Sequence, residues 1–198
     1  LIEELTRQVL GKALLAVAEW GRRGWGIAVA VNVSAQSLLD EQLERLVSEQ
    51  LLITGVSPQL LTLEITESSL LLEAPRTRST IEELNELGVH LSIDDFGTGY
   101  SALNYLQRFP FDVLKIDRSF TQELMAGRRE RKMIQTIVSL CDALDIKVTF
   151  EGVEIQDQLQ AAHDAYDASV ARVEDLEARI AEVRAARGVY VCVCVCVR

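Results

Sequence analysis

The stretch HLSIDDFGTGYSAL, residues 90–103, is the most informative part of the sequence. Its short apolar run ends in two adjacent carboxylates, Asp94 and Asp95, and the glycine-rich turn Gly97-Thr98-Gly99 follows directly. An apolar run of this length that is bounded by glycine is typical of a buried strand. Because two carboxylates at a strand end repel each other unless something positive lies between them, the pair favours a bound cation. A solvated loop with two acids is the alternative, so the interpretation depends on the surrounding chain.

The composition is that of an ordinary globular protein with an acidic balance. The chain has 198 residues, 48% of them hydrophobic and 25% charged, which suffices for one domain or for part of a larger one. The net charge of −10 argues against a nonspecific binder of nucleic acid polymers or anionic membranes, because both require a basic surface. No apolar run approaches the ~20 residues that span a bilayer. The N-terminus has an amphipathic helix pattern rather than that of a signal peptide, and because it starts with Leu1 we expect the chain to begin inside a longer gene.

Apolar runs alternate with amphipathic segments along most of the chain. This order predicts βαβ units and a parallel sheet, either a barrel or an open doubly wound sheet. The expected strands are 27–34, 61–67, 91–95, 111–117 and 147–151. The expected helices are 3–20, 36–54, 69–87 with a break or a start near Pro75, a short helix from Ser101, and 120–144.

Each expected strand carries polar residues near its C-terminal end. Because that end of the strands holds the active site in (β/α) barrels, we expect these side chains to lie close together. Lys115 and Asp117 are two residues apart and therefore share one face of their strand. The full set, in chain order, is Asn32, Glu64, Glu67, Asp94, Asp95, Lys115, Asp117, Glu151 and Glu154.

The predicted ligands are carboxylate and amide oxygens. Such a set suits the hard cations Mg²⁺, Mn²⁺ and Ca²⁺ better than zinc. An acid-rich site of this kind could hold two metal ions ~3.5–4 Å apart, the arrangement used in phosphoester hydrolysis. Lys115 could hold the attacking water or neutralise developing charge, and Glu151 could be the general base. The turn at 97–99 could close over the site, because glycine lets the backbone move and approach a ligand.

Several stretches of the sequence resemble the EAL domain family, the bacterial cyclic-di-GMP phosphodiesterases. They are VNVSAQSL, LTLEITES, LSIDDFGTGYSALNYLQRFPFDVLKIDRSF, and EGVE at 151–154, and the resemblance covers about residues 1–160. It implies a modified TIM barrel. It also implies two Mg²⁺ or Mn²⁺ ions and hydrolysis of one phosphodiester bond, which turns the cyclic dinucleotide into linear pGpG.

The resemblance also assigns roles residue by residue. Lys115 is expected to contact the catalytic water, and Glu151 is expected to be the general base. The expected metal ligands are Asn32, Glu64, Asp94, Asp95 and Asp117. The residues expected to support or form the loop are Glu67, Gly97, Thr98, Gly99 and Ser101. Glu154, the second acid of EGVE, is expected to support the ligands from outside the metal site.

Three departures from the family pattern affect the expected fold. The Glu-Ala-Leu motif that names the family is absent; it should lie upstream and supply a metal ligand. Phe150 stands where the family usually has alanine, which could crowd the floor of the site. After Gln160 the pattern stops, without the expected last strand and its Gln-Gly motif. We therefore expect residues 1–160 to form a partial EAL domain, which is an α/β, incomplete TIM-type (β/α) barrel with mainly parallel strands, followed by a C-terminal helix.

Two further segments follow residue 160. Residues 161–187 have apolar positions at spacings of three and four, which predicts an amphipathic helix that either packs on the body or forms a short coiled coil. Residues 188–198 contain VYVCVCVCVR, which has strand periodicity and would also arise from a GTG-TGT repeat in the coding DNA. We expect an artefactual low-complexity tail rather than a zinc site, because the cysteine spacing differs from the usual C-x₂₋₄-C pairs.

The resemblance implies a role in bacterial second-messenger signalling. We expect a cyclic-di-GMP-specific phosphodiesterase domain that uses a metal-activated water, with weak or no turnover by this chain because two strands of the barrel are missing. The alternatives are a non-catalytic cyclic-di-GMP-binding or regulatory module and a non-functional fragment. The implied partners are cyclic-di-GMP, a second copy in a homodimer, and GGDEF or sensory domains of the parent protein. The implied location is the bacterial cytoplasm, including the cytoplasmic part of a larger membrane-anchored protein.

Overall fold

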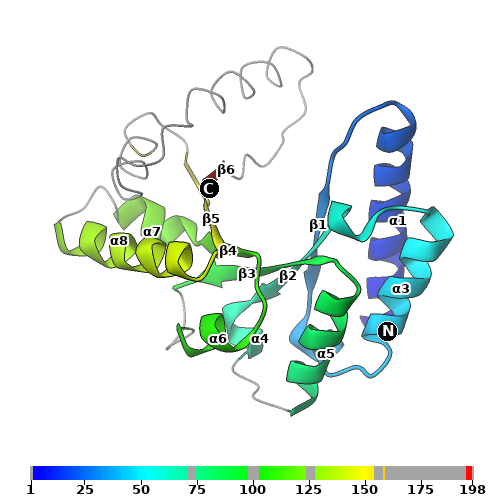
Figure 1. Ribbon diagram of the computed structural model, residues 1–198, viewed down its shortest axis with the longest axis horizontal. Coiled ribbons are helices and arrows are strands. Elements are labelled where there is room, and N and C mark those ends of the chain that lie inside the picture. The colour runs from blue at the N-terminus through cyan, green and yellow to red at the C-terminus, as the bar shows by residue number, and fades with distance from the viewer. Residues whose placement is uncertain are drawn as a thin grey trace. The chain divides into compact units, whose positions relative to one another are not determined.

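The computed structural model describes residues 2–70, 75–97, 103–123, 128–153, 158 and 195–197 (Figure 1). The chain divides into two compact units, Leu1–Lys115 and Ile116–Arg198, and each is considered by itself. Among the described residues, no helix combines the length and the apolar character that crossing a membrane requires.

The first unit alternates strands and helices, as the sequence predicts. Its strands lie in the order β1-β2-β3-β4, and the pairs β1–β2 and β2–β3 are parallel. The strands are β1 Val29–Val33, β2 Leu61–Thr66, β3 His90–Phe96 and β4 Val113–Ile116, whose last residue, Ile116, is assigned to the second unit. The helices are α1 Ile2–Arg22, α2 Ala35–Leu38, α3 Leu43–Thr54, the short 3-10 helix η1 Pro58–Leu60, α4 Glu67–Leu70, α5 Pro75–Glu86 and α6 Leu103–Arg108.

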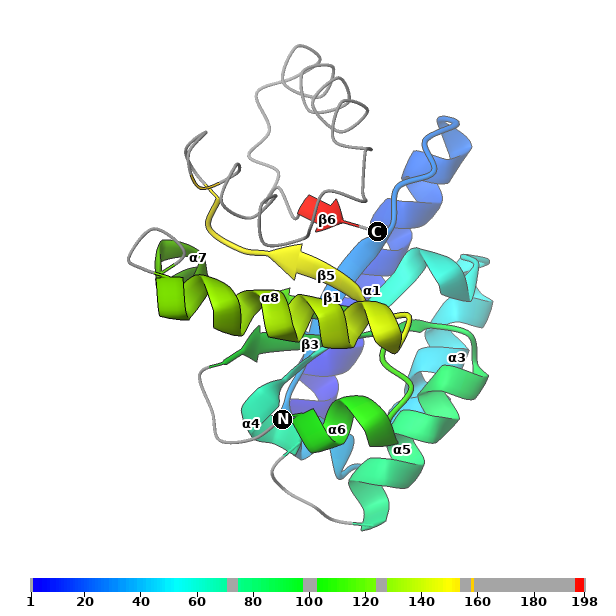
Figure 2. The same cartoon turned by 60° about the vertical axis from the view of Figure 1, so that its left-hand side comes forward.

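The apolar core of the first unit lies between its strands and its long helices. α1 packs against β1 and α3, and α3 packs against α5 (Figures 1 and 2). Alternate strand residues such as Leu63, Ile65 and Ile93 are completely buried, and so are Leu10 and Leu14 of α1. Because successive strand residues point to opposite sides, the residues between these apolar positions face away from the helices. The hydrophobic pattern therefore fixes which side of the sheet receives the polar residues.

The prediction of one helix over 36–54 is wrong, because two helices with a turn between them occupy this segment. The first is short: the Ser34 hydroxyl accepts a hydrogen bond from the Ser37 amide at 3.1 Å and caps its start. In the following turn the Asp40 carboxylate accepts a hydrogen bond from the Gln42 amide at 2.9 Å. A short polar side chain that bonds the backbone two residues ahead competes with helical hydrogen bonding, which explains the interruption.

The second unit contains α7 Arg118–Glu123, α8 Arg128–Ala143, β5 Lys147–Phe150 and β6 Val195–Val197. α8 packs against α7 and β5, and buried apolar residues such as Ile134 and Cys141 of α8 and Val148 of β5 supply its core. β6 pairs antiparallel with β5, with Thr149 opposite Cys196, so the strand periodicity of the tail is confirmed at this point. The helix expected over 161–187 lies outside the described residues.

Gly152, in the segment after β5, packs closely against Arg118. Its φ of 68° lies in the left-handed region, and a Cβ at this position would lie 2.6 Å from Cβ of Arg118. Gly55, at the end of α3, has the same φ of 68°, but a Cβ added there would meet no atom within 4 Å. The two glycines therefore share one conformational requirement and differ in their surroundings.

We expect Gly152→Ala to destabilise the protein clearly more than Gly55→Ala. Both variants place alanine in a left-handed conformation, which costs roughly 1–2 kcal/mol. Only Gly152→Ala adds the contact with Arg118, and overpacking of this kind costs about 1–3 kcal/mol more. Urea unfolding of the parent and both variants measures the two losses. Equal losses in the free energy of unfolding would contradict the close packing of Gly152 on Arg118.

Candidate metal centre

Neighbouring strands of the first unit place a row of polar side chains on one face of the sheet. Asn32 of β1 is in register with Glu64 of β2, and Glu64 is in register with Ser92 of β3. Residues in register on parallel strands point to the same side, and Asp94 shares that side because it lies two residues after Ser92. Predicted site residues from three strands are therefore brought together.

The Lys115 side chain of β4 completes this cluster. Its Nζ lies 2.9 Å from Oε1 of Glu64 and 2.9 Å from Oδ1 of Asp94. All three residues are at least nine-tenths buried, with exposed fractions of 7% for Lys115 and 9% for each acid. The remaining oxygen of Glu64, Oε2, accepts a hydrogen bond from Nδ2 of Asn32 at 3.3 Å.

The charges in this buried cluster do not balance. Two carboxylates face one ammonium, so the group carries an excess negative charge in a place where water is largely excluded. Buried charges are stable only when they are paired and hydrogen-bonded, because removing them from water costs free energy. A further cation near Glu64 and Asp94 would compensate the excess.

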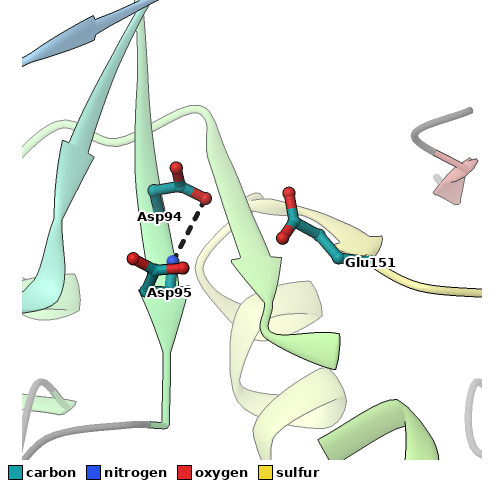
Figure 3. A group of neighbouring side chains, drawn as sticks. All are labelled: Asp94, Asp95 and Glu151. Atoms are coloured by element: carbon teal, nitrogen blue, oxygen red, sulfur yellow. Dashed lines mark hydrogen bonds between the residues drawn. The ribbon is translucent and has the colours of Figure 1, made fainter. Parts of the chain in front are cut away.

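Asp95 adds a second carboxylate beside Asp94. Its backbone amide donates a hydrogen bond to Oδ1 of Asp94 at 3.1 Å (Figure 3). A carboxylate oxygen of Asp95 lies within 4.8 Å of one of Asp94, close enough for both to contact one ion. Asp95 has a φ of 55°, in the left-handed region that aspartate tolerates better than most residues. In a regular strand, the side chains of Asp94 and Asp95 would point to opposite faces. The left-handed conformation of Asp95 interrupts this alternation.

Glu67 contacts the beginning of the glycine-rich turn. The residue is 2% exposed and lies at the start of α4 rather than at the end of the preceding strand, where the sequence placed it. Its Oε2 accepts a hydrogen bond from the Gly97 amide at 2.9 Å. Three other loop residues predicted for the site, Thr98, Gly99 and Ser101, lie outside the described residues.

Two of the predicted site residues that the structure describes belong to the second unit. Asp117 precedes α7, and its Oδ1 accepts hydrogen bonds from the amide and the hydroxyl of Ser119. The Ser119 hydroxyl in particular lowers the pKa of Asp117, so this carboxylate caps the helix in its ionised form. Glu151 directly follows β5 (Figure 3) and is partly buried. Its backbone amide donates a hydrogen bond to the Ile116 carbonyl at 3.0 Å. Glu154 lies outside the described residues.

Sequence reasoning missed Ser92, which belongs to the same polar face. It is 1% exposed, and within the described part of the chain its hydroxyl has no hydrogen-bond partner. The available signal was a polar residue two positions before Asp94 in an otherwise apolar strand. Period-two alternation would have placed it beside the predicted ligands.

The donors gathered in the first unit fit a hard divalent cation. They are carboxylate oxygens of Glu64, Asp94 and Asp95 and an amide group of Asn32, with neither sulfur nor imidazole among them. Oxygen donors of this kind are preferred by Mg²⁺, Mn²⁺ and Ca²⁺ rather than by zinc. The position of the Lys115 ammonium between Glu64 and Asp94 is consistent with a cluster built to surround positive charge.

The sequence has relatives among signalling proteins. It matches the family model described as the EAL domain over residues 1–170. The cyclic di-GMP phosphodiesterase NbdA of Pseudomonas aeruginosa is 44% identical over 133 residues, which are 67% of this chain and 17% of that protein. A signaling protein of Caulobacter vibrioides is 41% identical over 159 residues, 80% of this chain and 19% of that protein. The chain thus spans about a fifth of the length of these relatives.

Solved structures resemble the fold as well. The PaMucR phosphodiesterase in complex with c-di-GMP is 36% identical, with a TM-score of 0.76, over 83% of this chain and 67% of that one. The EAL domain of Mycobacterium smegmatis DcpA is 34% identical, with a TM-score of 0.77, over 83% of this chain and 74% of that one. These likenesses confirm the predicted α/β fold of the TIM-barrel type. Because the family match extends through most of its length, the chain belongs to the EAL domain family.

Proposed function

We propose that this chain is a cyclic-di-GMP phosphodiesterase domain that hydrolyses cyclic-di-GMP to linear pGpG. The observation that carries the proposal is the buried cluster of Lys115, Glu64 and Asp94, which has excess negative charge at the end of the strands where EAL-type chemistry is expected. Relatives described as a cyclic di-GMP phosphodiesterase and as a phosphodiesterase with bound c-di-GMP support the choice of substrate.

We assign the metal ligands to Asn32, Glu64, Asp94, Asp95 and Asp117, and the metal to two Mg²⁺ or Mn²⁺ ions. When bound, the ions would activate a water molecule and neutralise charge on the phosphate. The oxygen-only donors favour these ions. Asp117 is the weakest member of the set, because its carboxylate is already engaged by Ser119 at the start of α7.

The remaining residues would bind, orient and move protons. In the proposed reaction, water attacks one phosphorus and the bond from that phosphorus to the 3′-oxygen breaks, which leaves a linear dinucleotide with a 5′-phosphate. Glu151 would take the proton from the attacking water, and the leaving 3′-oxygen would take up a proton. Lys115 would hold the water and offset the charge that develops on the phosphate. Glu67 would fix the start of the loop through the Gly97 amide, and Glu154 would support the ligands.

A module that binds cyclic-di-GMP without cleaving it is the second candidate function. Phe150 favours it, because this residue is bulky, 1% exposed and directly adjacent to Glu151. A large side chain that is fixed in the core restricts how far its neighbour can adjust toward a substrate. The two functions share the binding step and differ only in turnover.

The oligomeric state, the neighbouring domains and the cellular location of this domain are also predictions. From the family resemblance we propose a homodimer, neighbouring GGDEF or sensory domains in a longer bacterial protein, and a cytoplasmic location for this domain. The acidic net charge of −10 supports a small-molecule partner rather than a nucleic acid polymer.

We expect Glu151→Gln to abolish hydrolysis while binding persists. Incubation of the full chain with Mn²⁺ and cyclic-di-GMP, followed by chromatography of the nucleotides, measures turnover, and isothermal titration calorimetry in Ca²⁺ measures binding. Loss of a general base lowers the rate by roughly 10²–10⁴-fold. Asp142→Asn, an exposed acid on α8 of the same unit, is the matched control and should leave both readouts unchanged.

The outcomes separate the two candidate functions. If the parent chain binds cyclic-di-GMP and forms no pGpG, the binding module is favoured over the enzyme. If the parent chain neither binds nor cleaves it, both proposals are contradicted. If Glu151→Gln cleaves as fast as the parent chain, the role of Glu151 as general base is wrong.

We expect Lys115→Met to destabilise the metal-free protein and to increase the stabilisation that Mn²⁺ provides. Without the ammonium, Glu64 and Asp94 remain as two buried negative charges, and breaking a buried ion pair in this way costs about 3–5 kcal/mol. Thermal unfolding in EDTA and in Mn²⁺ measures both effects, since only binding to the native state raises the midpoint.

The double variant Lys115→Met/Glu64→Gln is the control for this charge argument. It removes one of the two unpaired carboxylates and should recover much of the lost stability in EDTA. If the double variant is no more stable than Lys115→Met, the loss comes from packing rather than from uncompensated charge.

A further inference from the structure

Ser92 is a buried hydroxyl on the face of the sheet that carries the proposed metal ligands Glu64 and Asp94. It lies opposite Glu64 in the pairing of β2 with β3 and two residues before Asp94 on the same face. The residue is 1% exposed, and none of the described residues forms a hydrogen bond with its hydroxyl. Buried polar groups are rarely left without a partner, because they lose their hydrogen bonds to water on folding. Such a group therefore requires an explanation.

We propose that Ser92 is a positioning residue for Glu64, to which its hydroxyl donates a hydrogen bond when a divalent cation occupies the site. This inference rests on the metal site of the proposed function. Carboxylates that ligate metal ions are usually hydrogen-bonded by residues behind them, which fixes their orientation. Ser92 is in register with Glu64 on the neighbouring strand, so its hydroxyl lies on the same face of the sheet as the Glu64 carboxylate.

Both carboxylate oxygens of Glu64 already have a donor in this structure. Oε1 of Glu64 is bonded to the Lys115 ammonium at 2.9 Å, and Oε2 is bonded to the Asn32 amide at 3.3 Å. A divalent cation beside Glu64 and Asp94 repels the ammonium that lies between them. As Lys115 withdraws, Glu64 loses a donor, and the Ser92 hydroxyl can replace it by rotation about one side-chain bond.

The neighbouring groups cannot take this role as readily. Asp94 and Asp95 only accept hydrogen bonds while they are ionised. Thr66, opposite Asp94, already has its hydroxyl within 2.7 Å of Ser69 Oγ and 3.1 Å of Ser68 Oγ. Ser92 is thus the buried hydroxyl on this face of β2 and β3 that has no hydrogen-bond partner among the described residues.

A purely structural role for Ser92, as a small side chain that fits a tight space, predicts a different behaviour. The alanine variant would then have the same effect on the stability of the metal-free protein and of the metal-bound protein. If the hydroxyl is needed only in the metal-bound state, its removal leaves the metal-free protein as stable as before or more stable, because an unpartnered buried group is deleted. The loss appears only when metal binds.

The experiment compares metal affinity with metal-free stability in the full chain. The variants are Ser92→Ala and Ser92→Cys, of which the second keeps the shape of the side chain with a slightly larger atom that donates weakly. Thr121→Val in the second unit is the matched control, because Thr121 is also completely buried with an unpartnered hydroxyl among the described residues. Calorimetric titration with Mn²⁺ alone gives the affinity, and thermal unfolding in EDTA gives the stability.

We expect both Ser92 variants to bind Mn²⁺ about 10-fold or more weakly than the parent, the effect usual for loss of a residue that supports a metal ligand. Their unfolding midpoints in EDTA should equal or exceed that of the parent, and Thr121→Val should bind Mn²⁺ like the parent. A Mn²⁺ affinity of Ser92→Ala within two-fold of that of the parent would overturn the proposal. A loss of stability in EDTA large enough to account for the weaker Mn²⁺ binding would overturn it as well. A parent chain that binds no Mn²⁺ would instead refute the metal site itself, and with it this role of Ser92.

Discussion

The arrangement of the first unit depends on one buried ammonium between two carboxylates. β2, β3 and β4 each contribute one charged residue, Glu64, Asp94 and Lys115, and burying any of the three without the others costs free energy. A slip of one residue in the pairing of β2 with β3 would turn Glu64 toward the helices and Ile65 toward the charges. The ion pairs and the apolar alternation therefore require the same register, and both disfavour a pairing shifted by one residue.

The cluster also explains how a fold can keep a functional site that is costly for its stability. Leu63 and Ile65 flank Glu64 on the opposite face, and Ile93 does the same for Asp94, all of them completely buried. Burial of such side chains stabilises a fold by roughly 1.5–3 kcal/mol each. This offsets the desolvation of the acids but leaves their excess negative charge uncompensated. A cation that binds there would relieve the charge without repacking the core, so metal binding and fold stability are coupled.

Local patterns explain most of what the sequence predicted correctly. Strand and helix order, the parallel sheet, and the gathering of Glu64, Asp94 and Lys115 all follow from period-two alternation and from the common direction of the strand ends. The failures have a different origin. The Asp40 turn that divides the helix expected over 36–54 comes from competition between side chain and backbone, and such competition leaves no periodicity in the sequence. The unpartnered Ser92 hydroxyl depends on contacts between strands, which only the fold specifies.

The contacts around Glu64 and Asp94 of the first unit differ from those around the main chain of Glu151 in the second. In the first, Glu64 and Asp94 are held by side-chain contacts with Lys115, so their positions can respond to the charge that lies between them. In the second, the main chain around Glu151 is anchored: its amide donates a hydrogen bond to the Ile116 carbonyl, and Gly152, with its left-handed main chain, packs closely against Arg118. A metal ligand benefits from adjustable contacts, because its partner changes when the ion arrives. The proposed general base has to reach one water molecule, and the main-chain contacts of Glu151 fix the point from which its side chain extends. These contacts support the roles proposed for Glu64, Asp94 and Glu151.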